Sequence, residues 1–137
     1  MATTTATITL SSADLTGDAL SLSTTATLTK AGTLTGLDQT TGVGRKTTTA
    51  TDDVTLFAAA DYTDDKNHKV YIKNTSTVAT EFVTVKVGGQ EIGRLYSGDW
   101  MFIPWSADTT PATDCDLVYT PSVATSLTVE YALIFEA

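Results

Sequence analysis

Apolar and polar residues alternate most clearly in the final segment of the chain, residues 127–135. Every second position there is apolar: Leu127, Val129, Tyr131, Leu133 and Phe135. Successive side chains of a β-strand point to opposite faces, so this period of two predicts a long strand with one buried face.

Shorter stretches with β-forming residues precede this segment from Asp53 onward. They are "DVTLFAA", "KVYIKN", "EFVTVKV", "EIGRLY", "WMFIPW" and "LVYT". The pair Gly88–Gly89 separates two of them, and glycine accepts the positive φ of a tight hairpin turn. No stretch has a helical period. We therefore predict an all-β fold of about eight or nine strands, an antiparallel β-sandwich of the jelly-roll kind.

Residues 1–50 differ in composition from the rest of the chain. Threonine accounts for 30 of the 137 residues, and 19 of these lie in the first 55 positions. Threonine favours the surface of a sheet, and short alternations at Ile8/Leu10, Leu20/Leu22 and Ala26/Leu28 predict half-buried strands. A glycosylated stalk is the alternative, but such stalks are rich in proline, which is missing from the first 100 residues. We predict an arm or strands for contacts between subunits in 1–50, and a sandwich domain in 51–137.

The net charge of −8 narrows the possible partners. The eight basic residues are scattered, whereas nucleic-acid binding needs a positive stripe, and an anionic membrane would repel the chain. The first residues have neither the charge nor the apolar core of a signal peptide. We expect synthesis in the cytoplasm, with no nucleic-acid or membrane partner.

Candidate catalytic chemistry is sparse. His68 is the only histidine, and in its polar segment we expect it to be exposed at the start of a strand. A hydrolase would need His68 as its base, and the sequence has no G-x-S-x-G elbow. Cys115 lies between Asp114 and Asp116, whose charges disfavour a reactive thiolate. We predict no enzymatic activity, no catalytic residue and no cofactor.

Acidic residues cluster at 52–53, 61–67 and 108–116. Calcium binds oxygen-rich loops, but these clusters lack the glycine and glutamate spacing of an EF-hand. We interpret them as solvated loops and predict no metal site. Asn74-Thr75-Ser76 matches a glycosylation acceptor, which has little weight without a secretion signal.

The stretch Gly93–Ala107, "GRLYSGDWMFIPWSA", holds both tryptophans. In an unbroken strand Trp100 and Trp105 face opposite sides, which disfavours a flat sugar-binding platform. Pro104 lacks a ladder donor, so it restricts the strand to a sheet edge or ends it. We predict that four aromatic residues are anchors of the core or of an interface: Tyr96, Trp100, Phe102 and Trp105.

Several segments together resemble small β-rich structural proteins of tailed bacteriophages, especially phages of marine and cyanobacterial hosts. The segments are "LTKAGTLTGLDQTTGVGRKT", "VYIKNTS", "EIGRLYSGDWMFIPW" and "LTVEYALIF". The resemblance implies a virion protein, such as a capsid decoration, head-fibre or tail-associated subunit. It also implies a homo-oligomer, for example a trimer, with the major capsid protein or other virion proteins as partners. The alternative is a glycan- or receptor-binding module of a tail or fibre.

Overall fold

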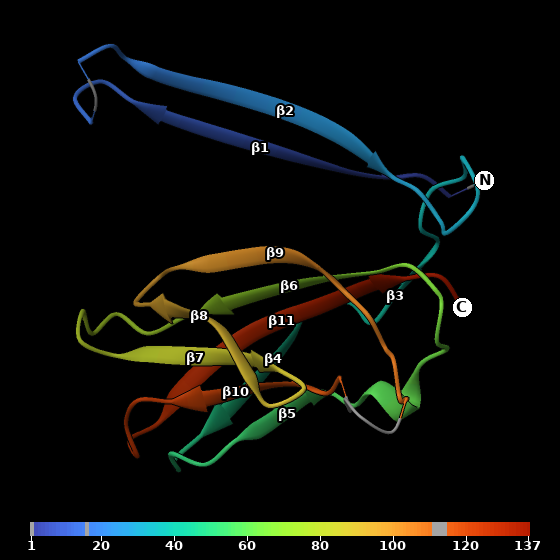
Figure 1. Ribbon diagram of the computed structural model, residues 1–137. Helices are drawn as coiled ribbons and strands as arrows, with labels where there is room; N and C mark the ends of the chain where they lie inside the picture. The colour runs from blue at the N-terminus through green and yellow to red at the C-terminus, as the bar shows by residue number, and fades with distance from the viewer. Residues whose placement is uncertain (1, 16, 111–114) are drawn as a thin grey trace.

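The computed structural model describes residues 2–15, 17–110 and 115–137. Over these described residues the fold is all-β, with antiparallel sheets and 11 strands, which confirms the predicted class. A projecting two-stranded arm and two larger sheets make up the molecule (Figure 1).

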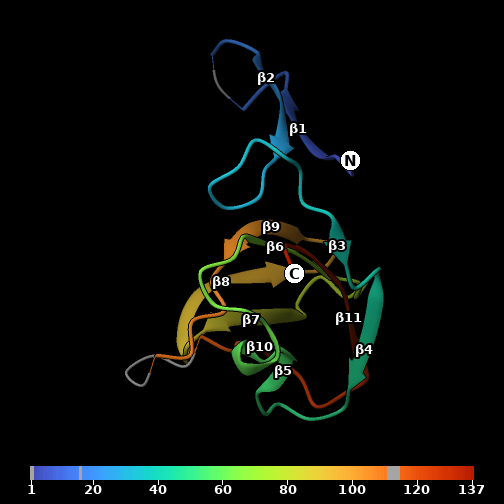
Figure 2. The same ribbon diagram turned by 90° about the vertical axis from the view of Figure 1, so that its right-hand side faces the viewer.

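The arm is a hairpin of β1 (Thr4–Ser12) and β2 (Leu20–Leu28). These strands pair only with each other and form a sheet of their own. Figure 1 shows the arm above the sandwich, on the side of β9, β6 and β11. In Figure 2, only the segment that follows β2 leads down from the arm to the sandwich.

The two larger sheets hold the remaining strands. One has the order β5-β10-β7-β8 and the other the order β3-β11-β6-β9, with β4 also paired to β11. The bounds in the first sheet are β5 Val54–Phe57, β7 Phe82–Val87, β8 Gln90–Tyr96 and β10 Leu117–Pro121. Those in the second are β3 Gln39–Thr40, β4 Gly44–Thr48, β6 His68–Asn74, β9 Trp100–Trp105 and β11 Leu127–Phe135.

From β4 to β11, successive strands alternate between the two sheets, except that β7 and β8 lie in the same sheet. If β4 is counted as the first strand and β11 as the eighth, the sheets have the orders 2-7-4-5 and 1-8-3-6. Their facing sides enclose a core that includes Val70, Ile72, Val85, Tyr119 and Leu133, all fully buried. The shared core makes the two sheets one sandwich-like unit.

The apolar residues at every second position of β11 point into this core. Leu127, Val129 and Leu133 are buried, while Tyr131 and Phe135 pack partly buried against the same cluster. The glycine pair forms the predicted β7–β8 hairpin turn, with φ of 56° at Gly88 and 75° at Gly89. Both predictions are confirmed.

The Thr-rich zone is divided between the arm and the sandwich. Within residues 30–48 of this zone, β3 and β4 form and pair with β11. Both strands lie at the sheet edge and are mostly exposed, so backbone pairing rather than apolar alternation defines them. The two strands help to explain why the structure has more strands than the eight or nine expected.

Candidate functional site

The outer face of the five-stranded sheet carries an aromatic patch, formed by Trp100, Phe102 and Tyr71. Trp100 and Phe102 alternate with inward-facing residues on β9, and Tyr71 of β6 lies directly opposite Phe102. Trp100 is 53% exposed, and the other two are partly buried. The patch therefore has three rings on one face: two come from β9, and the third comes from the neighbouring strand β6.

Two charged side chains lie beside this patch on the same face of the sheet. Lys73 lies opposite Trp100, and Glu130 of β11 lies opposite Lys73. The Tyr71 hydroxyl donates to Glu130 at 3.4 Å. Burial, followed by the nearby Glu130 carboxylate, raises the pKa of Tyr71 above its ordinary value, so its hydroxyl stays protonated. The face offers apolar rings beside both a cation and an anion.

The four predicted anchors do not converge. Trp105 is 5% exposed in the core, where its Nε1 donates to the Cys115 carbonyl at 2.8 Å. Tyr96 is on β8 of the other sheet, with its ring centroid 5.4 Å from that of Phe82. Trp100 and Trp105 do face opposite sides, as the strand parity predicted. Pro104 is tolerated because β9 is an edge strand.

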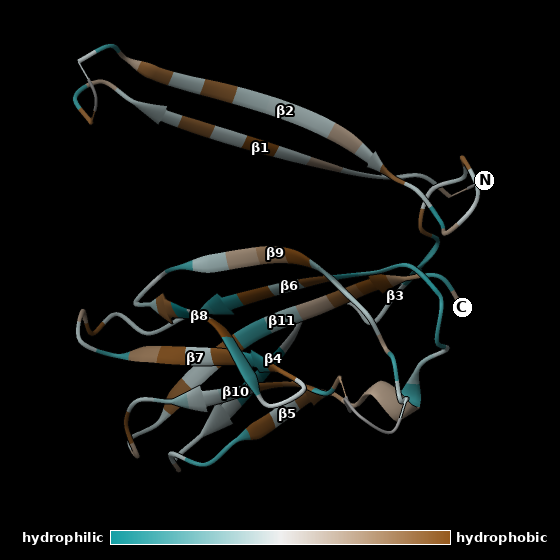
Figure 3. Ribbon diagram, in the orientation of Figure 1, coloured by the Kyte–Doolittle hydropathy of each residue, from teal (hydrophilic) through white to brown (hydrophobic). Residues whose placement is uncertain are grey.

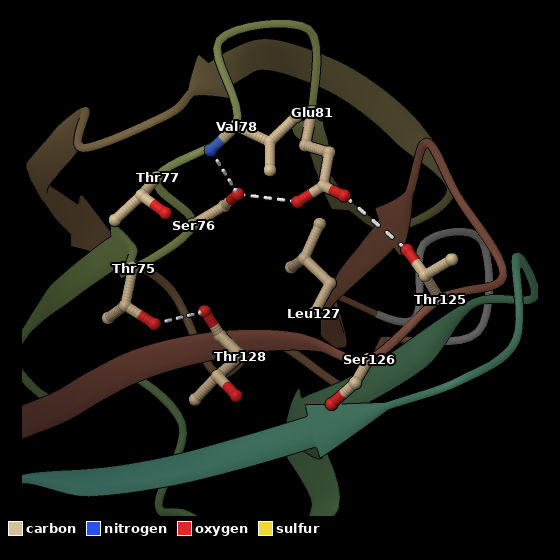
Figure 4. Close-up of a pocket in the computed structure, with 9 residues that line it drawn as sticks. All are labelled: Thr75, Ser76, Thr77, Val78, Glu81, Thr125, Ser126, Leu127 and Thr128. Atoms are coloured by element: carbon tan, nitrogen blue, oxygen red, sulfur yellow. Dashed lines mark hydrogen bonds between the residues drawn. The ribbon is translucent and has the colours of Figure 1, made fainter.

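A hydroxyl-lined pocket of about 520 Å³ lies between the loop after β6 and the loop before β11 (Figure 4). It is lined by Thr75, Ser76, Thr77, Val78, Glu81, Thr125, Ser126, Leu127 and Thr128. Six of these residues carry hydroxyl groups, Glu81 is the one carboxylate, and no basic side chain is among them. Such a lining suits a neutral polyhydroxylated ligand better than an anion.

Glu81 organises one wall of the pocket. Its carboxylate accepts from the Ser76 hydroxyl and, at 3.4 Å, from the Thr125 hydroxyl. The Ser76 Oγ also accepts from the Val78 amide at 3.0 Å, and Thr75 Oγ1 donates to the Thr128 carbonyl at 2.8 Å. These bonds, visible in Figure 4, hold the two loops together.

Asn74 connects the pocket to the turn that precedes Trp100. It is fully buried, and its Nδ2 donates to the carbonyls of Leu95, at 3.1 Å, and Glu81, at 3.3 Å. Its Oδ1 accepts from the Ser76 amide at 3.0 Å. The glycosylation match at this position therefore falls on an amide that the folded chain has already engaged.

His68 is 1% exposed, so the expectation of an exposed histidine was wrong. It has the inward parity of Val70 and Ile72 on β6. Its ring stacks on Phe135, with centroids 6.1 Å apart, and its Nδ1 lies 3.0 Å from the Lys66 carbonyl. Burial lowers its pKa, which keeps the ring neutral inside the aromatic core.

Carboxylates of the acidic clusters form an ion pair and a hydrogen bond with a backbone amide. Asp53 accepts from Lys86 at 2.8 Å, and Asp116 accepts from the Ala59 amide at 2.7 Å. Residues 111–114 of the third cluster lie outside the described residues. Within 2–15, 17–110 and 115–137, no three His, Cys, Asp or Glu side chains gather as metal ligands. The same ranges contain no helix long and apolar enough to cross a membrane.

The arm has two chemically different faces because side chains alternate along each strand and directly opposite residues share a face. One, the apolar arm face, carries Ala6, Ile8, Leu10, Leu20, Leu22, Ala26 and Leu28, together with Thr4, Ser12 and Thr24. The other, the hydroxyl arm face, carries Thr5, Thr7, Thr9, Ser11, Ser21, Ser23, Thr25 and Thr27. On the hydroxyl face, Thr7 and Thr25 share a hydrogen bond of 2.7 Å. The alternating bands of hydropathy along β1 and β2 are visible in Figure 3.

Sequence reasoning missed Tyr71 and the pocket. The alternation in "KVYIKN" gives the parity of Tyr71, but only the β6–β9 register places it beside Phe102. The pocket forms where two loops about 50 residues apart meet, and loop contacts of this kind leave no periodic signal.

Comparison with known proteins gives no match: no model of a protein family, no curated protein and no solved structure is significantly similar to the chain. The arm, the aromatic patch and the pocket are therefore the features that indicate a function.

Proposed function

We propose that the chain is a non-enzymatic structural subunit of a tailed-phage virion, of the capsid decoration type, which works through protein–protein contacts. The observation that carries this proposal is the β1–β2 arm. It stands away from the sandwich, and Ile8, Leu10, Leu20 and Leu22 expose between 37% and 52% of their surfaces. Extended apolar surface of this kind marks an interaction site.

The strand order supports the same class. We interpret the orders 2-7-4-5 and 1-8-3-6, counted from β4 to β11, as two Greek keys wound into a jelly roll. Jelly rolls recur in viral capsid and lectin domains. This fold-level analogy agrees with a structural subunit and with a sugar-binding module, and it does not decide between them.

The placement of the candidate catalytic groups favours the structural function. The His68 ring is enclosed by Phe135, Trp105 and Tyr62, which prevents it from reaching a substrate. Many weak contacts, repeated by symmetry, can stabilise a shell through multivalency. The partners in this proposal are further copies of the chain, for example in a trimer, and the major capsid protein.

The test is the copy number in purified particles of the phage that encodes the chain. Quantitative mass spectrometry should find a number that matches the symmetry of the head or the tail. Electron cryomicroscopy should then place the sandwich on the particle surface. Absence from purified particles would reject the proposal.

A second candidate, glycan binding, is favoured by the hydroxyl-lined pocket and the exposed Trp100. Sugars bind through hydroxyl hydrogen bonds and stacking on aromatic rings. A glycan array should then show binding that is lost in Glu81→Gln or Trp100→Ala. Tyr96→Ala is the matched control, because Tyr96 is similarly exposed but lies on the other sheet. An array without signal removes this candidate.

A further inference from the structure

The apolar arm face lacks a covering layer. A two-stranded hairpin alone in water is marginally stable at best, and three strands or a packed layer are usually needed. Here β1 and β2 have no third strand, and both strands are exposed along most of their length. Leu28, at the base, is the one buried residue in either strand. The rest of the apolar arm face is mostly exposed.

The base of the arm is attached firmly and holds the face off its own sandwich. Thr4 Oγ1 donates to the Leu37 carbonyl at 2.8 Å, and the Leu37 amide donates to the Leu28 carbonyl at the same distance. Farther along, the Asn67 side chain donates to the Thr29 carbonyl, and the Ala31 amide donates to Glu136 at 3.1 Å.

Gly36 fixes the same base by close packing. The backbone at Gly36 passes close to the backbone at Thr3. A Cβ at position 36 would lie 2.9 Å from the Cα of Thr3, so any residue other than glycine would require the backbone to shift. The arm therefore leaves the sandwich in a set direction, and its own sheet does not cover the apolar face.

The charges indicate what kind of partner fits. The protein carries a net charge of −8, so two copies repel each other over most of their surfaces. The arm is the exception, because neither Thr4–Ser12 nor Leu20–Leu28 contains a charged residue. An uncharged apolar face is complementary to itself, as a contact between identical subunits requires.

We propose that the apolar arm face packs against the same face of another copy of this chain. Two or three arms would then bury Ile8, Leu10, Leu20 and Leu22 as facing layers about 10 Å apart. The hydroxyl faces, with pairs such as Thr7–Thr25, would remain toward water. This inference rests on the proposed function and names the first partner within it.

The area buried between two arms indicates how tightly the copies would associate. Nine residues at about 3.4 Å each, on two strands about 4.8 Å apart, give a footprint of roughly 300 Å² per arm. A pair of arms then buries about 600 Å², half of the roughly 1,200 Å² at which stable interfaces begin. The association should therefore be reversible and should depend on concentration between about 1 μM and 1 mM.

Sedimentation equilibrium of the full chain tests this directly. The mass should rise from the 14.4 kDa of one copy toward two or three copies as the concentration increases. Leu10→Thr with Leu22→Thr removes apolar surface while keeping uncharged, β-compatible residues, and it should leave a monomer. The matched control is Thr9→Ala with Ser23→Ala, the adjacent cross-strand pair on the hydroxyl face, which should associate like the wild type.

Disulfide trapping identifies the surface independently of affinity. In a Cys115→Ser background, Thr24→Cys lies opposite Ile8 at the centre of the apolar face and should form a cross-link between copies. Thr25→Cys, one residue away on the hydroxyl face, should not. A chain that stays monomeric, or whose association survives the double leucine change, overturns the inference. Such a result leaves the virion proposal open, because particle copy number tests that separately.

Discussion

Leu10 and Leu22 lie directly opposite each other across the arm, and 52% and 46% of their surfaces are exposed. A cross-strand apolar pair contributes well under about 1 kcal/mol unless another layer covers it. The arm is therefore the part of the molecule whose stability depends most on a partner.

Hydrogen exchange should detect this dependence. In dilute protein, amides of β1 and β2 should exchange much faster than those of β6 and β11, because few buried contacts oppose opening of the arm. Raising the concentration should slow exchange in the arm and leave the core strands unchanged. Mass-spectrometric exchange at several concentrations measures both. Equal protection of arm and core in dilute protein would contradict the prediction.

Gly36→Ala should loosen the arm without unfolding the sandwich. The added Cβ would lie within about 3 Å of backbone atoms of Thr3 and Thr4, so the crossing strands must shift. We expect faster limited proteolysis within residues 2–28 and an unchanged melting temperature of the sandwich. Gly17→Ala is the control, since a Cβ there meets nothing within 4 Å.

The two tryptophans should differ sharply in their contribution to stability. Trp105→Ala empties a core position and removes the donor to the Cys115 carbonyl, so it should lower the free energy of unfolding by about 3–5 kcal/mol. Trp100→Ala changes an exposed side chain and should cost less than about 1 kcal/mol. Denaturant unfolding of both variants measures the difference. Similar losses in both would show that Trp100 is also structural.

The same tryptophans show how far the sequence could be interpreted. Alternation predicted their opposite faces, and Pro104 predicted either an edge strand or the end of the strand, of which the structure has the edge strand. The position of Tyr96 on the other sheet depends on how the β8–β9 turn crosses between sheets, and period two carries no information about that. Likewise, a polar neighbourhood in sequence indicated an exposed His68, while its parity with Val70 and Ile72 determined its burial.

Asn74 should be the most sensitive polar residue near the pocket. Asn74→Ala leaves the carbonyls of Leu95 and Glu81 and the amide of Ser76 without this partner in a buried site. The expected loss is about 2–3 kcal/mol of unfolding free energy. Thr77→Ala, on the exposed part of the same loop, should change stability by less than about 0.5 kcal/mol. Thermal or urea unfolding compares them, and equal effects would contradict the importance assigned to Asn74.

The pH dependence of stability should report the buried His68. Burial lowers its pKa below the ordinary 6.5, so between these two pKa values the unfolded chain binds more protons than the folded chain. The free energy of unfolding should therefore fall as the pH falls from about 7 toward 5. Asp53, whose pKa is lowered from 3.8 mainly by its hydrogen bond from Lys86, loses its contribution only at lower pH.

His68→Phe isolates the effect of this histidine. Phenylalanine keeps an aromatic ring against Phe135 but cannot bind a proton, so the decline between pH 7 and 5 should flatten. Melting temperatures of both proteins across this range provide the measurement. If the wild type and the variant decline in parallel, His68 is not the group responsible.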